Sequence, residues 1–139
     1  MATDVINLAW KQMCKRKFSE AITLLESKAD VYEEDFEFYI MIATAFLYIG
    51  DFGSASTYFQ KARKIKITDT RLLLGQAIIF LRRGDTKRAL QYYLDVKDNE
   101  PSNKIAADAI EFIRVNGDYD TICRSFDTGV IQQFYPPLG

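Results

Sequence analysis

The chain has 139 residues, of which 48% are hydrophobic and 14% aromatic, so it can build a core and is not expected to be disordered. Its net charge of -1 and its pI near 5.5 exclude a general attraction to nucleic acids or to anionic membranes. It has no histidine, which excludes the usual general base and the common catalytic triads.

The chain begins with a predicted helix pair at about residues 2–35. The turn of this pair is Arg16-Lys17, and its second helix lies in the segment "FSEAITLLESK", which starts at Phe18. The start of the chain lacks the basic stretch and apolar block of a signal peptide. Cys14 and Cys123 lie near opposite ends, which favours free thiols in a reducing compartment. We therefore expect a cytoplasmic protein, unless an upstream signal or membrane anchor is missing from the sequence as given.

A second pair, at about residues 36–69, has the clearest helical spacing. Its apolar residues recur at helical intervals on both sides of Gly50-Asp51: Tyr39, Ile42, Ala43 and Phe46, then Phe52, Ala55 and Phe59. Glycine accepts the left-handed conformation that ends a helix, and the aspartate can cap the next helix by accepting a backbone N–H. The longest apolar run, Phe38 to Ile49, has 12 residues, whereas about 20 span a membrane. This run is therefore expected to form a buried helix.

The same turn contains Asp51-Phe52-Gly53, the tripeptide that holds magnesium in protein kinases. A kinase also needs a Gly-rich phosphate loop, a strand lysine and a catalytic loop with a histidine, which this chain lacks. A chain of 139 residues is also too short for the two kinase lobes. We therefore interpret the tripeptide as a turn between helices, in which Phe52 begins the next buried face.

The turn recurs along the chain with a period of about 34 residues. Gly50-Asp51 recurs 34 residues later as Gly84-Asp85. It recurs again 33 residues after that as Gly117-Asp118. Small residues that would let paired helices approach closely have the same period: Ala9, Ala43 and Ala77, and Ala21, Ala55 and Ala89. A third pair is predicted at about residues 70–103 and a shorter fourth at about 104–127. Pro101 and Ser102 separate these two pairs, and we expect Ser102 to cap the following helix.

The period and these residue types resemble the tetratricopeptide repeat (TPR) family over nearly the whole chain. The second and third pairs fit best, and Pro101 stands at the family's closing proline position. The first pair departs at Arg16-Lys17 and Lys28, and the fourth is one residue short and has Ile122 in place of the alanine. The resemblance implies an all-α fold. Residues 1–127 would form a right-handed α-solenoid, a superhelix of antiparallel helix pairs with three repeats and a degenerate fourth, and residues 128–139 an extended tail.

In the TPR family, the first helices of the pairs line a concave groove that binds other proteins. The resemblance implies that this groove is lined here by Ile6, Trp10, Met13, Glu37, Ile40, Met41, Thr44, Tyr48, Arg71, Leu74, Ile78 and Arg82. Such a surface, apolar and aromatic at its centre, would fit an extended peptide or an amphipathic helix of a partner protein, with Trp10 and Tyr48 as its main contacts. The same side chains can instead pack between neighbouring helices, especially Met13 and Ile78, and Trp10 can cover the open end of the core.

The tail "GVIQQFYPPLG" does not continue the helical pattern. Pro136-Pro137 favours an extended conformation, and the apolar side chains around it include Phe134, Tyr135 and Leu138. We expect the tail to fold back over the last helix, because the degenerate fourth pair leaves a face uncovered. If it lies across another molecule instead, the protein is a structural subunit that self-assembles through its solenoid ends and its tail.

Nothing in the sequence favours catalysis. It has no clustered cysteine ligands for a metal and no glycine pattern for a phosphate, so we expect no metal, no cofactor and no enzyme activity. Basic residues gather near the turns within pairs and acidic residues near the opposite ends, an arrangement that the helix dipoles explain without a ligand. RNA binding along the basic edge is a third alternative and would depend steeply on salt. The sequence as a whole predicts a non-catalytic adaptor or scaffold that binds another protein.

Overall fold

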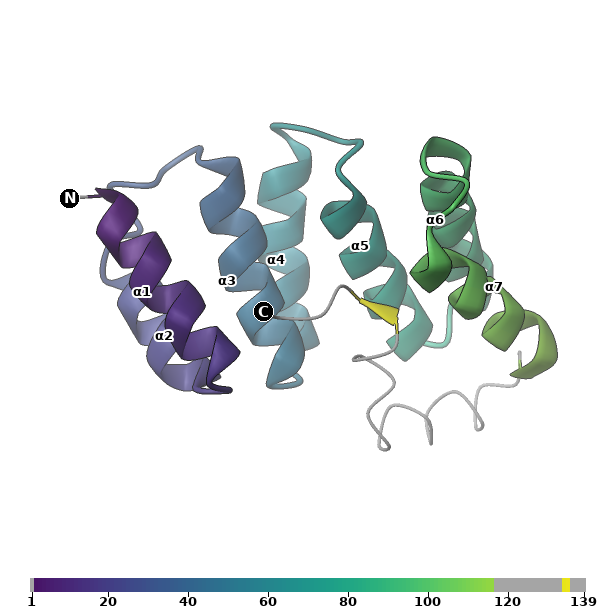
Figure 1. Ribbon diagram of the computed structural model, residues 1–139, viewed down its shortest axis with the longest axis horizontal. Helices are drawn as coiled ribbons and strands as arrows, with labels where there is room; N and C mark the ends of the chain where they lie inside the picture. The colour runs from purple at the N-terminus through teal and green to yellow at the C-terminus, as the bar shows by residue number, and fades with distance from the viewer. Residues whose placement is uncertain (1, 117–133, 136–139) are drawn as a thin grey trace. The chain divides into compact units, whose positions relative to one another are not determined.

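The structure is a computed structural model that describes residues 2–116 and 134–135 (Figure 1). The described residues form seven α-helices: α1 (Ala2–Cys14), α2 (Phe18–Glu26), α3 (Phe36–Tyr48), α4 (Phe52–Arg63), α5 (Thr70–Arg82), α6 (Thr86–Asn99) and α7 (Lys104–Asn116). No strand occurs in this part of the chain, and the prediction of an all-α fold is confirmed.

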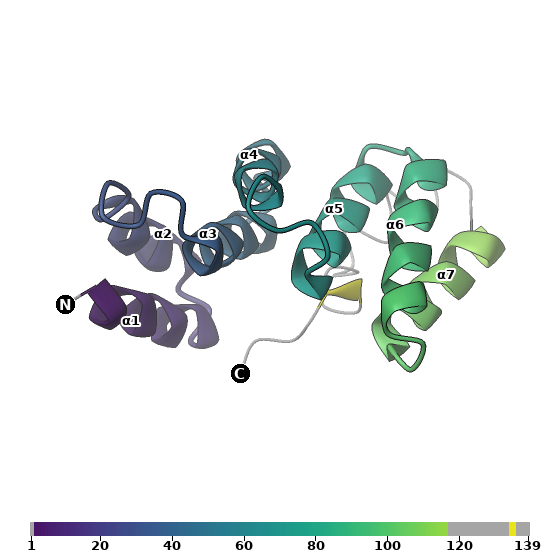
Figure 2. The same ribbon diagram turned by 90° about the horizontal axis from the view of Figure 1, so that it is seen from above.

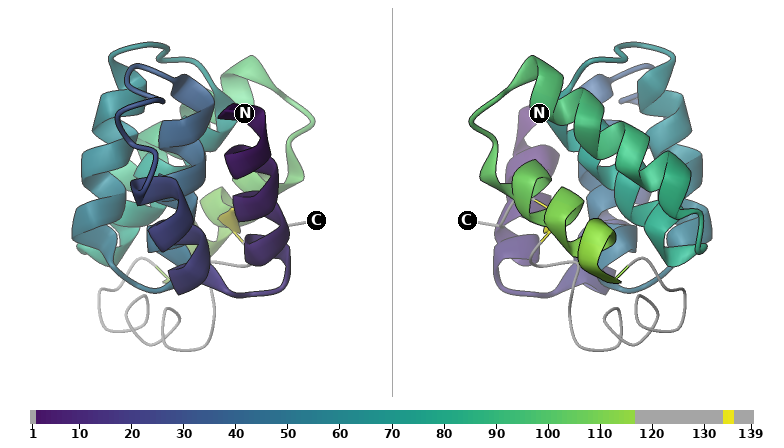
Figure 3. Two further views of the ribbon diagram at one scale, coloured as in Figure 1. Left: turned by 90° about the vertical axis from the view of Figure 1, so that its left-hand side faces the viewer. Right: turned by 90° about the vertical axis from the view of Figure 1, so that its right-hand side faces the viewer.

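The chain divides into two compact units, with the boundary between Ile67 and Thr68. The first unit contains α1 to α4, and the second contains α5 to α7 together with residues 134–135. Within the first unit, α1 packs on α2, α2 on α3 and α3 on α4 (Figure 2). Within the second unit, α5 packs on α6 and α6 packs on α7. The right-hand view of Figure 3 shows α6 and α7, in two shades of green, side by side.

The turns inside the second and third pairs have the predicted geometry. Gly50 and Gly84 have φ values of 83° and 80°, in the left-handed region that favours glycine. Asp51 accepts a hydrogen bond from the backbone N–H of Ser54 at 3.1 Å and so caps α4. Asp85 caps α6 in the same way. The tripeptide Asp51-Phe52-Gly53 thus lies at the junction between two helices, as predicted, but only Asp51 belongs to the turn, because Phe52 and Gly53 are the first residues of α4.

The first turn reaches the same conformation with other residues. Arg16 has a φ of 64°, and Lys17 precedes α2 without a side-chain hydrogen bond to the helix start. The departure from Gly-Asp thus leaves the path of the chain unchanged but removes the aspartate cap. The third of the predicted turns, Gly117-Asp118, lies outside the described residues, as do Ile122, Cys123 and the predicted end of the fourth pair near residue 127.

The predicted cap of α7 was wrong by one residue. The backbone N–H of Ala106 donates to Oδ1 of Asn103 at 2.9 Å, so Asn103 and not Ser102 caps this helix. Ser102 lies in the turn before the helix. A 2.9 Å hydrogen bond from the N–H of Asn103 to the carbonyl of Glu100 closes this turn. Only the residue directly before the first helical residue can reach the free N–H groups of the first turn.

The small residues lie where paired helices cross. All six predicted alanines, at positions 9, 21, 43, 55, 77 and 89, are completely buried. In the first unit, larger side chains fill the space around them and form a core of Met13, Ile22, Leu25, Tyr32, Phe38 and Ile42. Burial of such side chains contributes about 1.5–3 kcal/mol each, which is the main stabilisation of a helix pair.

The described part of the tail packs against its own chain. Phe134 and Tyr135 are buried, at 3% and 2% exposure. The ring of Phe134 lies 5.1 Å from that of Phe112 on α7 and 6.5 Å from that of Tyr93 on α6, measured between ring centres. The tail therefore folds back onto the α6–α7 pair at these two residues. Leu138 lies outside the described residues.

Candidate functional site

The first helices of the first unit carry an apolar surface that is only partly covered. Ile6 and Trp10 lie one turn apart on α1, and Met41 and Tyr48 lie two turns apart on α3, so each pair shares a helix face. The two helices contact each other (Figure 2). Ile6, Met41 and Tyr48 pack along the edge of the core, whereas Trp10 is 39% exposed and stands outside it. We call these four residues the first-helix surface.

Tyr48 is the most constrained member of this surface. Its ring stacks on that of Phe18 with 5.0 Å between ring centres and a 12° angle between the planes, and the guanidinium of Arg16 lies 5.8 Å from its centre. Burial raises the pKa of Tyr48, and the charge and hydrogen bond of Arg16 lower it in part. Tyr48 thus joins the end of α3 to the turn between α1 and α2, which explains why an arginine suits this turn.

Five predicted groove residues are buried rather than exposed. Met13, Ile40, Thr44, Leu74 and Ile78 have between 0% and 5% of their surface accessible. Thr44 also donates its hydroxyl to the carbonyl of Ile40 at 2.7 Å, within α3. The burial of these five side chains favours the packing alternative at their positions.

The predicted polar positions have separate environments. Arg71 pairs with Asp69, with 3.0 Å between Nη2 and Oδ2 and 3.1 Å between Nε and Oδ1. The same carboxylate accepts the backbone N–H of Arg71 and caps α5. Burial alone would raise the pKa of Asp69, but the hydrogen bonds and charge of Arg71 outweigh it and hold this pKa below its usual value. Glu37 is exposed in the first turn of α3, and Arg82 is half-buried in the last turn of α5.

Two aromatic stacks were not predicted from the sequence. Phe46 stacks on Tyr58 at 5.9 Å in the second pair, and Phe80 stacks on Tyr92 at 5.6 Å in the third. Lys61 lies 5.1 Å above the ring of Tyr58, a cation–π geometry that adds to this packing. The signal was present in the sequence, because both ring positions recur after one period, 46 as 80 and 58 as 92.

Residues with reactive side chains do not converge in the described part of the chain. No group of three or more Cys, Asp and Glu side chains there is placed to hold a metal ion. Cys14 is an exposed free thiol at the end of α1. No helix among the described residues is both long and apolar enough to cross a membrane.

Comparisons with known proteins agree with the repeated helix pairs. No family model matches the sequence, and no curated protein matches it. Among solved structures, the crystal structure of MamA is similar, with a TM-score of 0.73 over 93% of this chain and 75% of that chain. The fold is TPR-like. Only 16% of the residues are identical. The similarity therefore shows the fold of this chain, and it does not show what the chain binds.

Proposed function

We propose that this chain is a TPR protein that binds a peptide or helix of another protein through its first-helix surface and acts as a non-catalytic adaptor or scaffold. The observation that carries the proposal is Trp10, the single tryptophan of the chain. This large apolar residue is 39% exposed, whereas Ile6, Met41 and Tyr48 are half-buried against the core. Tryptophan is among the residues that contribute most to protein interfaces.

The surface favours a partner with bulky apolar side chains. Ile6 and Met41 present aliphatic atoms at the edge of the core, and methionine adapts its shape to different side chains. Tyr48 offers only part of its ring, because Phe18 and Arg16 already contact it. An amphipathic helix or an extended segment with two or three apolar side chains would cover Trp10 and fill the space beside it.

The test compares two variants that remove apolar side chains at the protein surface, of which Met41 is half-buried. Trp10→Ala/Met41→Ala changes the first-helix surface, and Val31→Ala changes a side chain that is 62% exposed in the loop after α2. Proteins captured from a lysate of the source cells by the wild-type chain are identified and their binding is measured. We expect the double variant to lose about 2 kcal/mol, or roughly thirtyfold in Kd, while the control binds as the wild type does. Circular dichroism melts establish that both variants fold.

Equal binding by the folded double variant and the wild type would contradict the proposal. Self-assembly through the solenoid ends and the tail is the alternative function. The burial of Phe134 and Tyr135 within their own chain favours the adaptor, since these two side chains need no second copy to cover them.

A further inference from the structure

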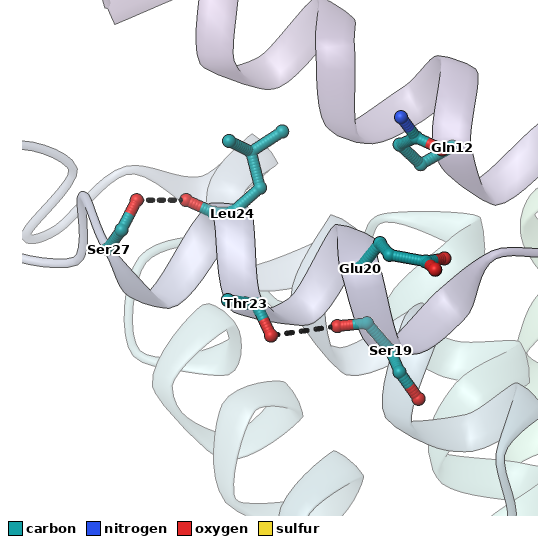
Figure 4. Close-up of a pocket in the computed structure, with 6 residues that line it drawn as sticks. All are labelled: Gln12, Ser19, Glu20, Thr23, Leu24 and Ser27. Atoms are coloured by element: carbon teal, nitrogen blue, oxygen red, sulfur yellow. Dashed lines mark hydrogen bonds between the residues drawn. The ribbon is translucent and has the colours of Figure 1, made fainter.

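A hollow lies between α1 and α2 in the first unit, with a volume of about 480 Å³ (Figure 4). It is lined by Gln12, Ser19, Glu20, Thr23, Leu24 and Ser27. In Figure 4, Gln12 reaches from α1 and Leu24 from α2 into the space between the two helices. The hollow is open to solvent, and most of its lining surface is apolar although five of its six lining residues are polar.

The internal repeat shows what fills this place elsewhere in the chain. Gln12 corresponds by the period to Phe46 and Phe80, and Leu24 corresponds to Tyr58 and Tyr92. In the second and third pairs, these positions hold two stacked rings, with interplanar angles of 7° and 11°. The first pair has no ring at either position. The hollow is therefore the place of a missing aromatic stack.

The polar groups around the hollow are unequally satisfied. The hydroxyls of Thr23 on α2 and of Ser27 directly after it donate to carbonyls of α2, those of Ser19 at 3.0 Å and Leu24 at 2.6 Å. The side-chain oxygen of Gln12, in contrast, is buried and has no hydrogen-bond partner among the described residues. Rotation of this amide brings its oxygen or its N–H groups toward the hollow, where a phenol hydroxyl can pair with either.

We propose that this hollow binds a tyrosine side chain of another protein, whose ring fills the place that the aromatic stacks occupy in the other two pairs. Tyrosine is the residue at this place in both of those pairs, at positions 58 and 92. Its ring would lie on Leu24 and its hydroxyl would meet the amide of Gln12. Glu20 adds a negative charge at the rim, which favours a tyrosine with basic neighbours.

The tyrosines of a second copy are already engaged within the described part of the chain. Four of them stack on or lie against other rings: Tyr39, Tyr48, Tyr58 and Tyr92. Three are buried: Tyr32, Tyr93 and Tyr135. The eighth, Tyr119, lies outside the described residues. This engagement favours another protein as the source of the tyrosine.

The proposed site is separate from the first-helix surface. Gln12 follows Trp10 by two residues on α1, which places it about 200° around the helix axis. A partner can therefore occupy either surface without the other. Failure of binding at one surface consequently leaves the proposal for the other unaffected.

The test is a titration of the full chain followed by two-dimensional NMR, with acetyl-Lys-Tyr-Lys-amide as the probe and acetyl-Lys-Ala-Lys-amide as its control. We expect saturable shifts of the Gln12 side-chain amide and of Leu24 with the tyrosine probe alone. The variant Gln12→Phe/Leu24→Tyr builds the stack of the other pairs into the hollow. It should bind the probe roughly tenfold more weakly or not at all, because its own ring takes the place. Its Tm should equal or exceed that of the wild type, and Trp10→Ala should leave probe binding unchanged.

Three results would overturn the proposal. The first is the absence of saturable shifts at Gln12 and Leu24, or equal shifts with the alanine probe. The second is undiminished probe binding by the filled variant; if that double variant loses its helical circular dichroism, Leu24→Tyr alone serves in its place. The third is concentration-dependent dimerisation of the wild type that the filled variant lacks, since the occupant would then be a second copy.

Discussion

At the scale of single residues, the turns inside the helix pairs depend on one left-handed position. Gly50 and Gly84 occupy it in the second and third pairs, and Arg16 occupies it in the first. For an L-residue with a Cβ this conformation costs about 1–2 kcal/mol, which Arg16 offsets in part by its contact with Tyr48. Glycine therefore adopts the left-handed conformation without a Cβ clash in the second and third pairs. In the first pair, the contact of Arg16 with Tyr48 offsets part of the cost.

Two nearby glycines, one before α4 and one within it, test this account with opposite signs. A Cβ on Gly50 would meet no atom within 4 Å, so Gly50→Ala should cost only the backbone term, about 1–2 kcal/mol of unfolding free energy. Gly53 lies in the first turn of α4, where a Cβ would contact Oδ1 of Asp51 at an ordinary 3.8 Å. Gly53→Ala should therefore stabilise the chain by about 0.5–1 kcal/mol. Urea titrations measure both, and a loss of stability in Gly53→Ala would contradict the argument.

At the scale of the helices, the capping residues recur at the same position of each repeat, even where the residue type changes from aspartate to asparagine. Asp35, Asp69 and Asn103 are spaced by one period each and cap α3, α5 and α7. Asp51 and Asp85 have the same spacing and cap α4 and α6. The start of α2 is the exception among these helices, since the equivalent residue is Lys17 and its side chain makes no capping hydrogen bond.

The corrected cap of α7 gives a second test. Asn103→Ala removes the acceptor of the Ala106 N–H and should cost about 1 kcal/mol of unfolding free energy. Ser102→Ala is the matched control, because Ser102 is exposed and precedes the cap, and it should change stability by less than about 0.5 kcal/mol. Chemical denaturation of the two variants decides between the positions. A larger loss for Ser102→Ala would show that Ser102 and not Asn103 caps α7.

At the scale of the whole molecule, the tail of the chain covers side chains of α6 and α7. Tyr93 is completely buried, and desolvation raises its pKa strongly. Phe134 meets the rings of Tyr93 and Phe112 from a position beyond the end of α7. This contact covers part of the core of the second unit, at the rings of Tyr93 and Phe112.

Removal of this ring should destabilise the protein. Phe134→Ala deletes a buried aromatic side chain, for which we expect a loss of about 3–5 kcal/mol in the unfolding free energy. Phe134→Leu keeps part of the buried surface and should lose less. Urea titrations followed by circular dichroism measure both variants, with hydrogen exchange at the amide of Tyr93 as a local readout. Phe134→Ala within about 0.5 kcal/mol of the wild type would show that the ring adds little.

The helix pairs could be predicted from the sequence because their signals are local and repeated. The glycines of the turns, the capping aspartates and the alanines at the crossings each act within a few residues. The period also contained the Asn103 cap, since one period after Asp69 leads to position 103. Residue type alone favours Ser102, because serine is a common N-cap, whereas the period leads to Asn103.

The candidate site could be predicted only in part, because exposure depends on neighbours that are distant in sequence. Leu74 and Ile78 share the helix face of the predicted groove, yet both are buried. Tyr48 at the end of α3 meets Phe18 at the start of α2, a contact between helix pairs that no repeat position indicates. The hollow beside Gln12 does have a signal in the sequence, because the rings at positions 46 and 58 have no counterpart at positions 12 and 24.

The regular spacing of the caps has a consequence for how the gene of such a protein can change. Each boundary between helices is marked by residues that recur after one period, so recombination between equivalent positions, such as Asp35 and Asp69, adds or removes one complete helix pair. Every remaining helix then keeps the start it had before. An in-frame insertion of another length would shift a cap away from its helix. Selection can therefore lengthen or shorten this chain in whole pairs without moving a cap away from its helix, and the residues around the hollow of the first pair are unchanged by such an event at the later pairs.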